Sequence, residues 1–206
     1  MENKINLILD FFNSQFPEAK CELNYSTPYQ LLVAVILSAQ CTDKRVNMVT
    51  KDLFKVAPTP QKMLELGEDK LKQIIHSCGF YNNKSKSIIS ASSDLIKNYN
   101  GHVPNTMDEL CSLAGVGRKT ANVVLAEAFN VPSIAVDTHV HRISKRLGLT
   151  GANSTPEKCE QDLLKLVPVS YQSKFHIQAV WFGRYQCKSL APQCDNCKLK
   201  SICKRK

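Results

Sequence analysis

The stretch Leu113–Leu125, which reads LAGVGRKTANVVL, constrains the fold of this chain more than any other. Its two glycines, Gly115 and Gly117, precede apolar residues at helical spacing, a pattern that predicts a tight turn leading into a helix. The first N–H groups of a helix have no partner within it, and the helix dipole makes them attractive to an anion. We therefore expect a phosphate-binding turn, with a purely structural turn as the alternative, because G-x-G before a helix is common.

Helix-start signals recur along the rest of the chain. Thr-Pro pairs at Thr27, Thr59 and Thr155 precede apolar runs, and Thr106-Met107-Asp108-Glu109 is a capping box that begins the first helix of a hairpin. We find no alternating strand pattern, no repeat and no low-complexity linker. The sequence therefore predicts an all-α fold.

Charge and hydropathy narrow the class of partner. The 206 residues carry 27 Lys and Arg against 18 Asp and Glu, a net charge of +9. In residues 187–206, six basic residues stand against Asp195 alone. This bias favours an anionic partner, most simply nucleic acid, although a lysine-rich proteome would also produce it. No apolar run approaches the roughly 20 residues of a membrane span, and no secretory signal is visible, so we expect a cytoplasmic protein without membrane contact.

The nine cysteines form two groups. In a chain that is not secreted they argue against a disulfide framework. We expect the five that lie among apolar neighbours to be small buried hydrophobes: Cys21, Cys41, Cys78, Cys111 and Cys159. The other four have the spacing C-x6-C-x2-C-x5-C and the density of a metal site: Cys187, Cys194, Cys197 and Cys203. Four thiolates suit zinc or an iron–sulfur cluster, and the spacing alone leaves both open.

Two residues have the chemistry of a catalytic pair. Lys119 follows the glycines in the first helical turn, where the dipole and partial burial would disfavour an ammonium, and a neutral amine can form a Schiff base. A lysine that contacts phosphate is the alternative. Asp137 lies in the sequence IAVDTH, where it is either a catalytic carboxylate or the N-cap of a helix at Thr138. His139 and His141 point to different helix faces and are expected to pack or to contact phosphate.

Together, the glycine turn with Lys119, the V-D-T-H motif at Asp137 and the cysteine spacing resemble the helix-hairpin-helix DNA glycosylases, most closely the endonuclease III family. The resemblance implies that the Lys119 amine attacks C1′ of a damaged nucleotide and expels the base. The imine then undergoes β-elimination, which cuts the strand 3′ to the abasic site. Asp137 would orient or deprotonate the lysine, or stabilise positive charge at the sugar. The four cysteines would hold a 4Fe–4S cluster of architectural role.

The resemblance also implies a partner and a set of DNA contacts. We expect a monomer that removes oxidised pyrimidines from double-stranded DNA and is associated with the nucleoid through DNA binding. Gln40 would fill the gap left by the extruded base, and Phe80, where the family more often has leucine, would act as a wedge. Packing of Phe80 in the core is the alternative. The remaining expected DNA contacts are Gly115, Gly117, Arg118 and Lys188.

The resemblance implies two helical lobes and leaves two rival functions. Residues 22–131 would form a six-helix lobe with the hairpin, and residues 1–21 with 132–206 a lobe that carries the cluster loop 187–203. One rival is a monofunctional adenine-mismatch glycosylase, although that family lacks the lysine at the position of Lys119. The other is a non-catalytic iron–sulfur DNA-binding protein, which would need neither Lys119 nor Asp137.

Overall fold

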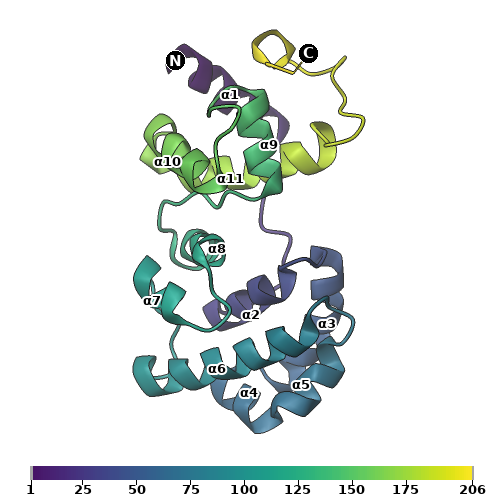
Figure 1. The fold of residues 1–206 in the computed structure, drawn as a ribbon, viewed down its shortest axis with the longest axis vertical. Coiled ribbons are helices and arrows are strands. Elements are labelled where there is room, and N and C mark those ends of the chain that lie inside the picture. Colours follow the sequence, from purple (N-terminus) through teal and green to yellow (C-terminus); the bar gives the residue numbers. More distant parts are fainter. Residues whose placement is uncertain (1, 206) are drawn as a thin grey trace. The chain divides into compact units, whose positions relative to one another are not determined.

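The computed structural model describes residues 2–205, and the regular structure in that range is entirely helical (Figure 1). This confirms the all-α class. The α-helices are α1 (Glu2–Gln15), α2 (Pro28–Ser38), α3 (Asp43–Val56), α4 (Pro60–Leu66), α5 (Glu68–Ile75), α6 (Tyr81–Tyr99), α7 (Met107–Ser112), α8 (Arg118–Phe129), α9 (Thr138–Arg146), α10 (Pro156–Leu166) and α11 (Gln172–Trp181). Short helical turns are η1 (Val169–Tyr171), η2 (Phe182–Gln186) and η3 (Lys200–Ile202). None of the helices in residues 2–205 is long and apolar enough to cross a membrane.

Threonine side chains start five of these helices. The hydroxyl oxygens of Thr27, Thr42, Thr59, Thr106 and Thr155 each accept a hydrogen bond from the backbone N–H three residues later. In α2, α4 and α10 a proline follows the cap at the first helical position, where its missing N–H costs no hydrogen bond. These caps explain why the predicted helix starts agree with the structure.

The chain divides into two compact units, and we call Glu22–Phe129 the hairpin unit. Its centre is α2, which is buried from Tyr29 to Leu37. A helix that is apolar on all sides must be covered on all sides, and here α3, α6 and α8 pack against it. Helices α4 and α5 pack on α6, and α7 packs on α8.

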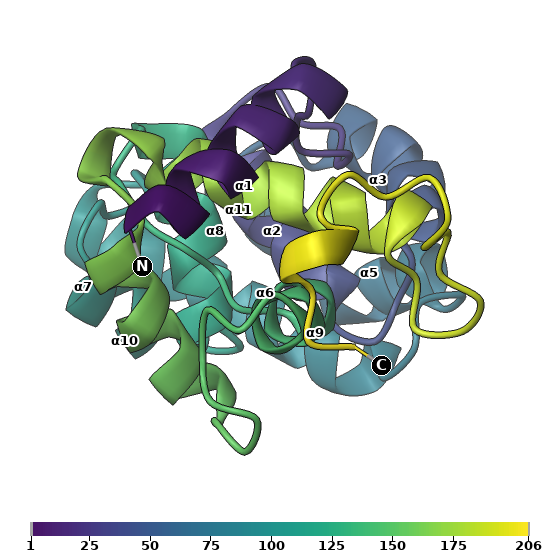
Figure 2. The ribbon, with the colours of Figure 1, turned by 90° about the horizontal axis from the view of Figure 1, so that it is seen from above.

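The second unit, which we call the terminal unit, joins Met1–Cys21 to Asn130–Lys206. Helix α1 lies beside α11 (Figure 2). A cluster of phenylalanine rings fills the space between them, and Phe12, Phe175 and Phe182 are almost fully buried. The ring centroid of Phe12 lies 5.6 Å from that of Phe175 and 5.5 Å from that of Phe182. Because these residues come from both ends of the chain, burial of the aromatic rings holds the first helix to the C-terminal segments.

One helix departs from the expectation. The sequence pattern predicts a continuous helix over 171–185, whereas the structure has a π-turn at Phe182–Gln186 after α11. The Cys187 N–H donates to the Phe182 carbonyl at 2.7 Å, and Arg142 donates to the Gly183 carbonyl at 2.9 Å. A Cβ on Gly183 would lie 2.8 Å from the His139 Cβ, so the glycine allows this close approach to α9. The π-turn therefore follows from a tertiary contact that periodicity does not encode.

Candidate active site

The glycine turn joins α7 to α8 at Leu113–Gly117. The Val116 N–H donates to the Leu113 carbonyl at 3.1 Å, and Gly115 has φ +78°, a left-handed conformation that favours glycine. A Cβ on Gly115 would lie 2.7 Å from the Ser87 Cβ of α6. Gly117 has open space around its Cα instead, and its carbonyl accepts from the Ala121 N–H at 2.9 Å. Gly115 is therefore needed to build the turn, while Gly117 leaves room for a ligand to approach.

Lys119 is the second residue of α8, as the sequence predicts, and its side chain is exposed. The expectation of partial burial is wrong for this structure, because the first turn of α8 projects beyond the packed face that includes Ala121, Val124 and Leu125. Arg118 is exposed beside Lys119 at the first helical position.

Asp137 is the N-cap of α9. Its Oδ1 accepts hydrogen bonds from the N–H groups of His139 and Val140, both at 2.8 Å, and the side chain is half-buried. The structural role that the sequence offers as an alternative is therefore present. Because both of these hydrogen bonds go to one carboxylate oxygen, capping does not use the whole functional group.

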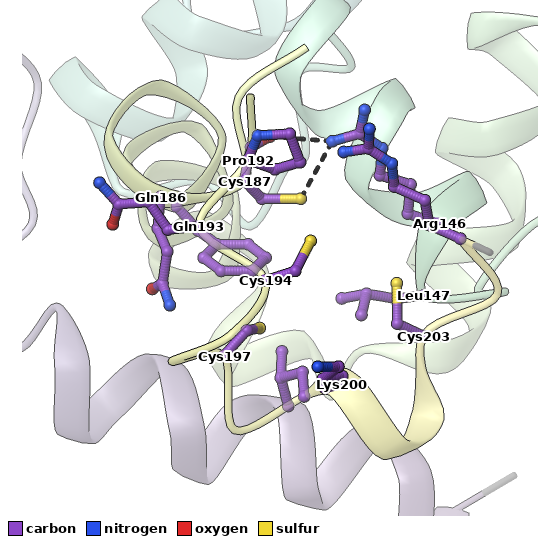
Figure 3. A pocket seen from close by; sticks show the side chains of 13 residues that line it. Arg146, Leu147, Gln186, Cys187, Pro192, Gln193, Cys194, Cys197, Lys200 and Cys203 are labelled. Atoms are coloured by element: carbon purple, nitrogen blue, oxygen red, sulfur yellow. Dashed lines mark hydrogen bonds between the residues drawn. The ribbon is translucent and has the colours of Figure 1, made fainter. Parts of the chain in front are cut away.

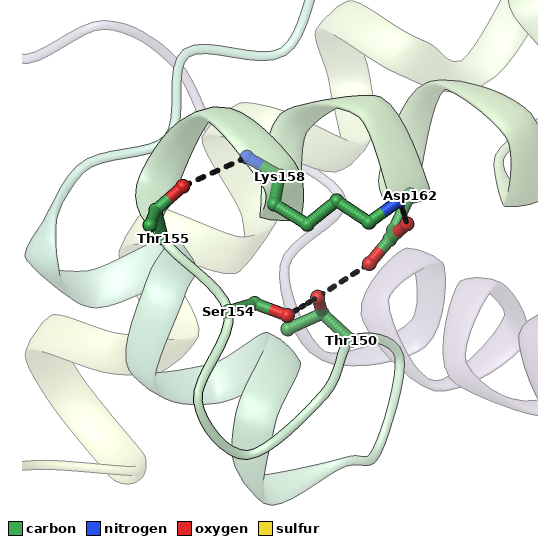
Figure 4. A network of polar contacts seen from close by, with 5 residues as sticks. All are labelled: Thr150, Ser154, Thr155, Lys158 and Asp162. Carbon is green, nitrogen blue, oxygen red and sulfur yellow. Dashed lines mark hydrogen bonds and ion pairs between the residues drawn. The ribbon is translucent and has the colours of Figure 1, made fainter.

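The two histidines of α9 make protein contacts. His141 Nε2 lies 2.8 Å from the Ser154 carbonyl, in the loop before α10. In that loop Thr150 donates to Asp162 at 2.6 Å, and Lys158 forms an ion pair with the same carboxylate at 3.0 Å (Figure 4). His139 Nδ1 lies 3.3 Å from Arg142, and burial lowers the pKa of His139. These contacts agree with the packing role expected for both rings.

Gln40 and Phe80 occupy two turns of the hairpin unit that touch each other. Both have left-handed backbones, with φ 53° and 58°, and both side chains are exposed, Phe80 to 62%. A Cβ on Gly79 would lie 3.3 Å from the Gln40 carbonyl oxygen, so the backbones are in contact. A large aromatic ring held in solvent on a strained backbone is not packed in the core.

The four C-terminal cysteines line one cavity of about 360 Å³ (Figure 3). Burial above all raises the pKa of the Cys197 thiol, and the charges of the other three cysteines raise it further, so the sulfurs are close enough to interact. Leu147, Phe182 and Leu199 supply apolar walls. No three His, Cys, Asp or Glu side chains in residues 2–205 are arranged to hold a single metal ion. Four thiols around an apolar cavity are nevertheless the donor set of an iron–sulfur cluster.

Two arginines of α9 hold the segment that carries Cys187, and neither was predicted from the sequence. Arg146 Nη1 donates to Cys187 Sγ and to its carbonyl, each at 3.2 Å, and to the Lys188 carbonyl at 2.8 Å. Arg142 reaches the Cys187 carbonyl from Nη2 at 3.2 Å. Their spacing of four, which puts both on one helix face, was the available signal. Lys188 itself is exposed.

The five remaining cysteines do not all behave as expected. Only Cys78 and Cys159 are buried. Cys111 is exposed, because it lies on the outer face of the short helix α7, and Cys21 and Cys41 are partly exposed. The expectation of five buried hydrophobes is therefore wrong for three of them.

Comparison with known proteins shows to which family this sequence and fold belong. Residues 33–169, which include the hairpin and Asp137, match the HhH-GPD superfamily of base excision DNA repair proteins. Endonuclease III of Bacillus subtilis strain 168 is 48% identical over 98% of this chain and 92% of its own length. The chain belongs to the endonuclease III family. Endonuclease III of Escherichia coli K12 is 43% identical over 97% of this chain and 94% of its own length.

Solved structures extend the likeness to DNA complexes. A trapped endonuclease III–DNA covalent intermediate superposes with a TM-score of 0.95 at 46% identity and covers 99% of this chain and 96% of its own. A non-covalent endonuclease III–DNA complex has the same TM-score and identity, and the match covers 99% of this chain and 95% of its own. As an endonuclease III family member, the chain is a bifunctional DNA glycosylase and abasic-site lyase of base excision repair, which confirms the predicted function and enzyme class.

Proposed function

We propose that Lys119 is the nucleophile of both reactions. Its amine attacks C1′ of the damaged nucleotide, the glycosidic bond breaks, and the base leaves with the bonding electrons. Nitrogen loses a proton, the C1′–O4′ bond of the sugar ring breaks while O4′ takes up a proton, and the opened sugar is joined to Lys119 as a protonated imine. Loss of a C2′ proton then expels the 3′ phosphate by β-elimination. The single observation that carries this proposal is the placement of an exposed lysine in the first turn of α8, directly after the glycine turn.

Asp137 assists the lysine through the carboxylate oxygen that does not cap α9. We propose that Oδ2 accepts a proton from the Lys119 ammonium or stabilises positive charge at the sugar, while Oδ1 keeps its hydrogen bonds to His139 and Val140. The cap supports this role, because a carboxylate fixed by two backbone donors has little freedom to turn away.

The substrate in this proposal is double-stranded DNA with an oxidised pyrimidine, bound by a monomer. Gln40 fills the space of the extruded nucleotide and Phe80 enters the stack as a wedge, supported by the exposure and paired turns of both residues. The backbone at Gly115 and Gly117 binds a phosphate at the α8 N-terminus, and Arg118 and Lys188 add charge to phosphate contacts.

We further propose that four thiolates hold a 4Fe–4S cluster: Cys187, Cys194, Cys197 and Cys203. When bound, the cluster supplies a rigid cross-link among four thiolates rather than chemistry at the sugar. The shared cavity supports this assignment, as do the hydrogen bonds from Arg146 to Cys187. The loop that begins with Lys188 would then be fixed for contact with phosphate.

Trapping of the imine tests the nucleophile. Duplex DNA with one thymine glycol is incubated with the protein and borohydride, which reduces an imine to a stable amine and leaves protein and DNA covalently joined. Lys119→Gln should abolish trapping and base release but keep DNA binding, because the glycine turn is unchanged. Lys70→Gln, at an exposed lysine of α5, is the matched control and should trap like the wild type.

Two results would favour the rival functions. Base release at the wild-type rate by Lys119→Gln, with no trapped adduct, would show that water is the nucleophile and that the enzyme is monofunctional. Absence of base release by the cluster-loaded wild type from every oxidised-pyrimidine duplex, with retained DNA binding, would favour a non-catalytic DNA-binding protein.

A further inference from the structure

Two cysteines flank the contact between the Gln40 turn and the Phe80 turn. Cys41 follows Gln40 between α2 and α3, and Cys78 precedes Gly79 between α5 and α6. The backbones already touch at Gln40 and Gly79, as the 3.3 Å approach described above shows. Because each cysteine is the chain neighbour of a residue in that contact, the fold brings their side chains together from positions far apart in sequence.

The Cys41 and Cys78 side chains are close enough to interact. Burial raises the pKa of Cys78 to about 11, and the charge of Cys41 and a hydrogen bond with its side chain contribute to that rise. Cys78 is 1% exposed, whereas Cys41 is partly exposed. The pair therefore has one sulfur that a reagent in solution can reach and one that only its neighbour can reach, which is the arrangement of an attacking and a resolving thiol.

A buried amine lies beside the pair. Lys84 of α6 is 6% exposed, and its Nζ donates to the Leu37 carbonyl at the end of α2 at 2.8 Å. Its charge lowers the pKa of Cys78, in opposition to burial, and so does that of Arg45. These two cations therefore offset part of the rise in the pKa of Cys78 that burial causes, and the thiolate is the form that reacts in thiol–disulfide exchange.

We propose that Cys41 and Cys78 form a reversible intramolecular disulfide by exchange with a low-molecular-weight disulfide such as oxidised glutathione. The Cys41 thiolate attacks one glutathione sulfur, the glutathione S–S bond breaks, and one glutathione leaves as thiolate. Cys78 then loses its proton to solvent and attacks the Cys41 sulfur of the mixed disulfide, and the second glutathione leaves. The two protein thiols are oxidised, and one glutathione disulfide is reduced to two glutathione thiols.

The bond would change the surface that carries Gln40 and Phe80. A disulfide draws two sulfurs to about 2.05 Å, closer than any hydrogen-bonded pair, and fixes the torsions between them. Both turns would be pulled together and would lose the freedom to adjust to DNA. We expect the oxidised enzyme to excise base damage from duplexes at least several-fold more slowly, a consequence that rests on the proposed function of Gln40 and Phe80.

Disulfide formation is measured on the cluster-loaded protein without reference to activity. After incubation with oxidised glutathione at unchanged visible absorbance of the cluster, we expect a mass loss of two hydrogens and a cross-linked peptide that contains Cys41 and Cys78. Cys41→Ser should remove both signals. Cys111→Ser, at an exposed cysteine on α7, is the control and should leave them unchanged. Cys78→Ser should instead accumulate a glutathione adduct on Cys41.

Two results would overturn the proposal. The first is a stable glutathione adduct on Cys41 of the wild type that never resolves, and the second is thiols that remain reduced when the glutathione buffer is fully oxidising. Cys41→Ser alters a partly exposed side chain, so the test stands even where Cys78→Ser folds poorly. Thymine glycol excision by the fully reduced protein tests the proposed function separately, since it does not depend on the disulfide.

Discussion

Arg146 Nη1 lies 3.2 Å from Cys187 Sγ and donates a hydrogen bond to it. The same guanidinium group donates to the carbonyls of Lys188 and Ser189, so one side chain of α9 fixes the start of the cluster loop and polarises the first of its four thiols. The backbone of Arg146 also accepts from the Lys204 N–H at 2.7 Å, just after Cys203. Arg146 therefore ties together both ends of the loop.

Arg146→Gln should weaken retention of the cluster. Partners of metal ligands typically change metal affinity about 10- to 100-fold when removed, and Gln cannot supply the charge or the forked donors. We expect at least a roughly 10-fold faster loss of visible absorbance and of iron in the presence of a chelator. Lys145→Gln, on the neighbouring position of α9, is the control. If Arg146→Gln loses the cluster no faster than the control does, the loop and not the arginine holds Cys187.

Gly115→Ala should destabilise the hairpin unit. The new Cβ would lie 2.7 Å from the Ser87 Cβ, and alanine is disfavoured at φ +78°. Strain of this kind costs about 1–3 kcal/mol, so we expect a lower midpoint in urea denaturation. Gly117→Ala is the matched control, because nothing lies within 4 Å of its Cβ position. An equal loss in both variants would show that neither the approach to Ser87 nor the left-handed backbone at Gly115 causes it.

Capping and catalysis by Asp137 can be separated with two variants. Asp137→Asn keeps an oxygen that can accept from His139 and Val140, so stability should change by less than about 1 kcal/mol, while the lost charge should slow excision by several orders of magnitude. Asp137→Ala should lose both the cap and the activity. Single-turnover excision and urea denaturation measure the two effects. If Asp137→Asn excises the base at the wild-type rate, Asp137 has a structural role only.

Helix positions could be predicted from the sequence because their causes are local. A threonine cap three residues before its partner N–H, or a proline in the first turn, acts within a few residues, as at Thr59-Pro60. The position of Lys119 in the first turn of α8 followed in the same way from the two glycines. Its exposure did not, because burial depends on which elements cover a helix end, and periodicity describes only the helix itself.

The parts that could not be predicted are contacts between distant segments. The π-turn at η2 depends on Arg142, which lies 41 residues earlier in the chain and donates a hydrogen bond to the Gly183 carbonyl. Likewise, Cys41 and Cys78 looked like unrelated core residues, since nothing in either neighbourhood indicates that the two turns touch. The exposure of Phe80 also results from tertiary structure, because its position before α6 is compatible with either a core or a surface ring.

Glu127 should make the stability of the hairpin unit depend on pH. Burial raises the pKa of this α8 carboxyl, and a hydrogen bond with Tyr25 offsets part of that rise. Between the pKa values of the unfolded and folded states the folded protein binds more protons, so the free energy of unfolding contributed by Glu127 falls as pH increases. The decrease starts near the unfolded value of about 4.3 and is complete above the folded value.

Glu127→Gln removes this titration while it keeps a side chain that can hydrogen-bond to Tyr25. We expect the variant to unfold at higher urea than the wild type at pH 8, because the cost of burying a carboxylate is gone, and to match it well below pH 4, where the glutamate is protonated in both states. Glu18→Gln, at an exposed side chain, is the control for the loss of one negative charge. A loss of stability in Glu127→Gln at pH 8 would mean that a charge-dependent interaction of the carboxylate outweighs its desolvation.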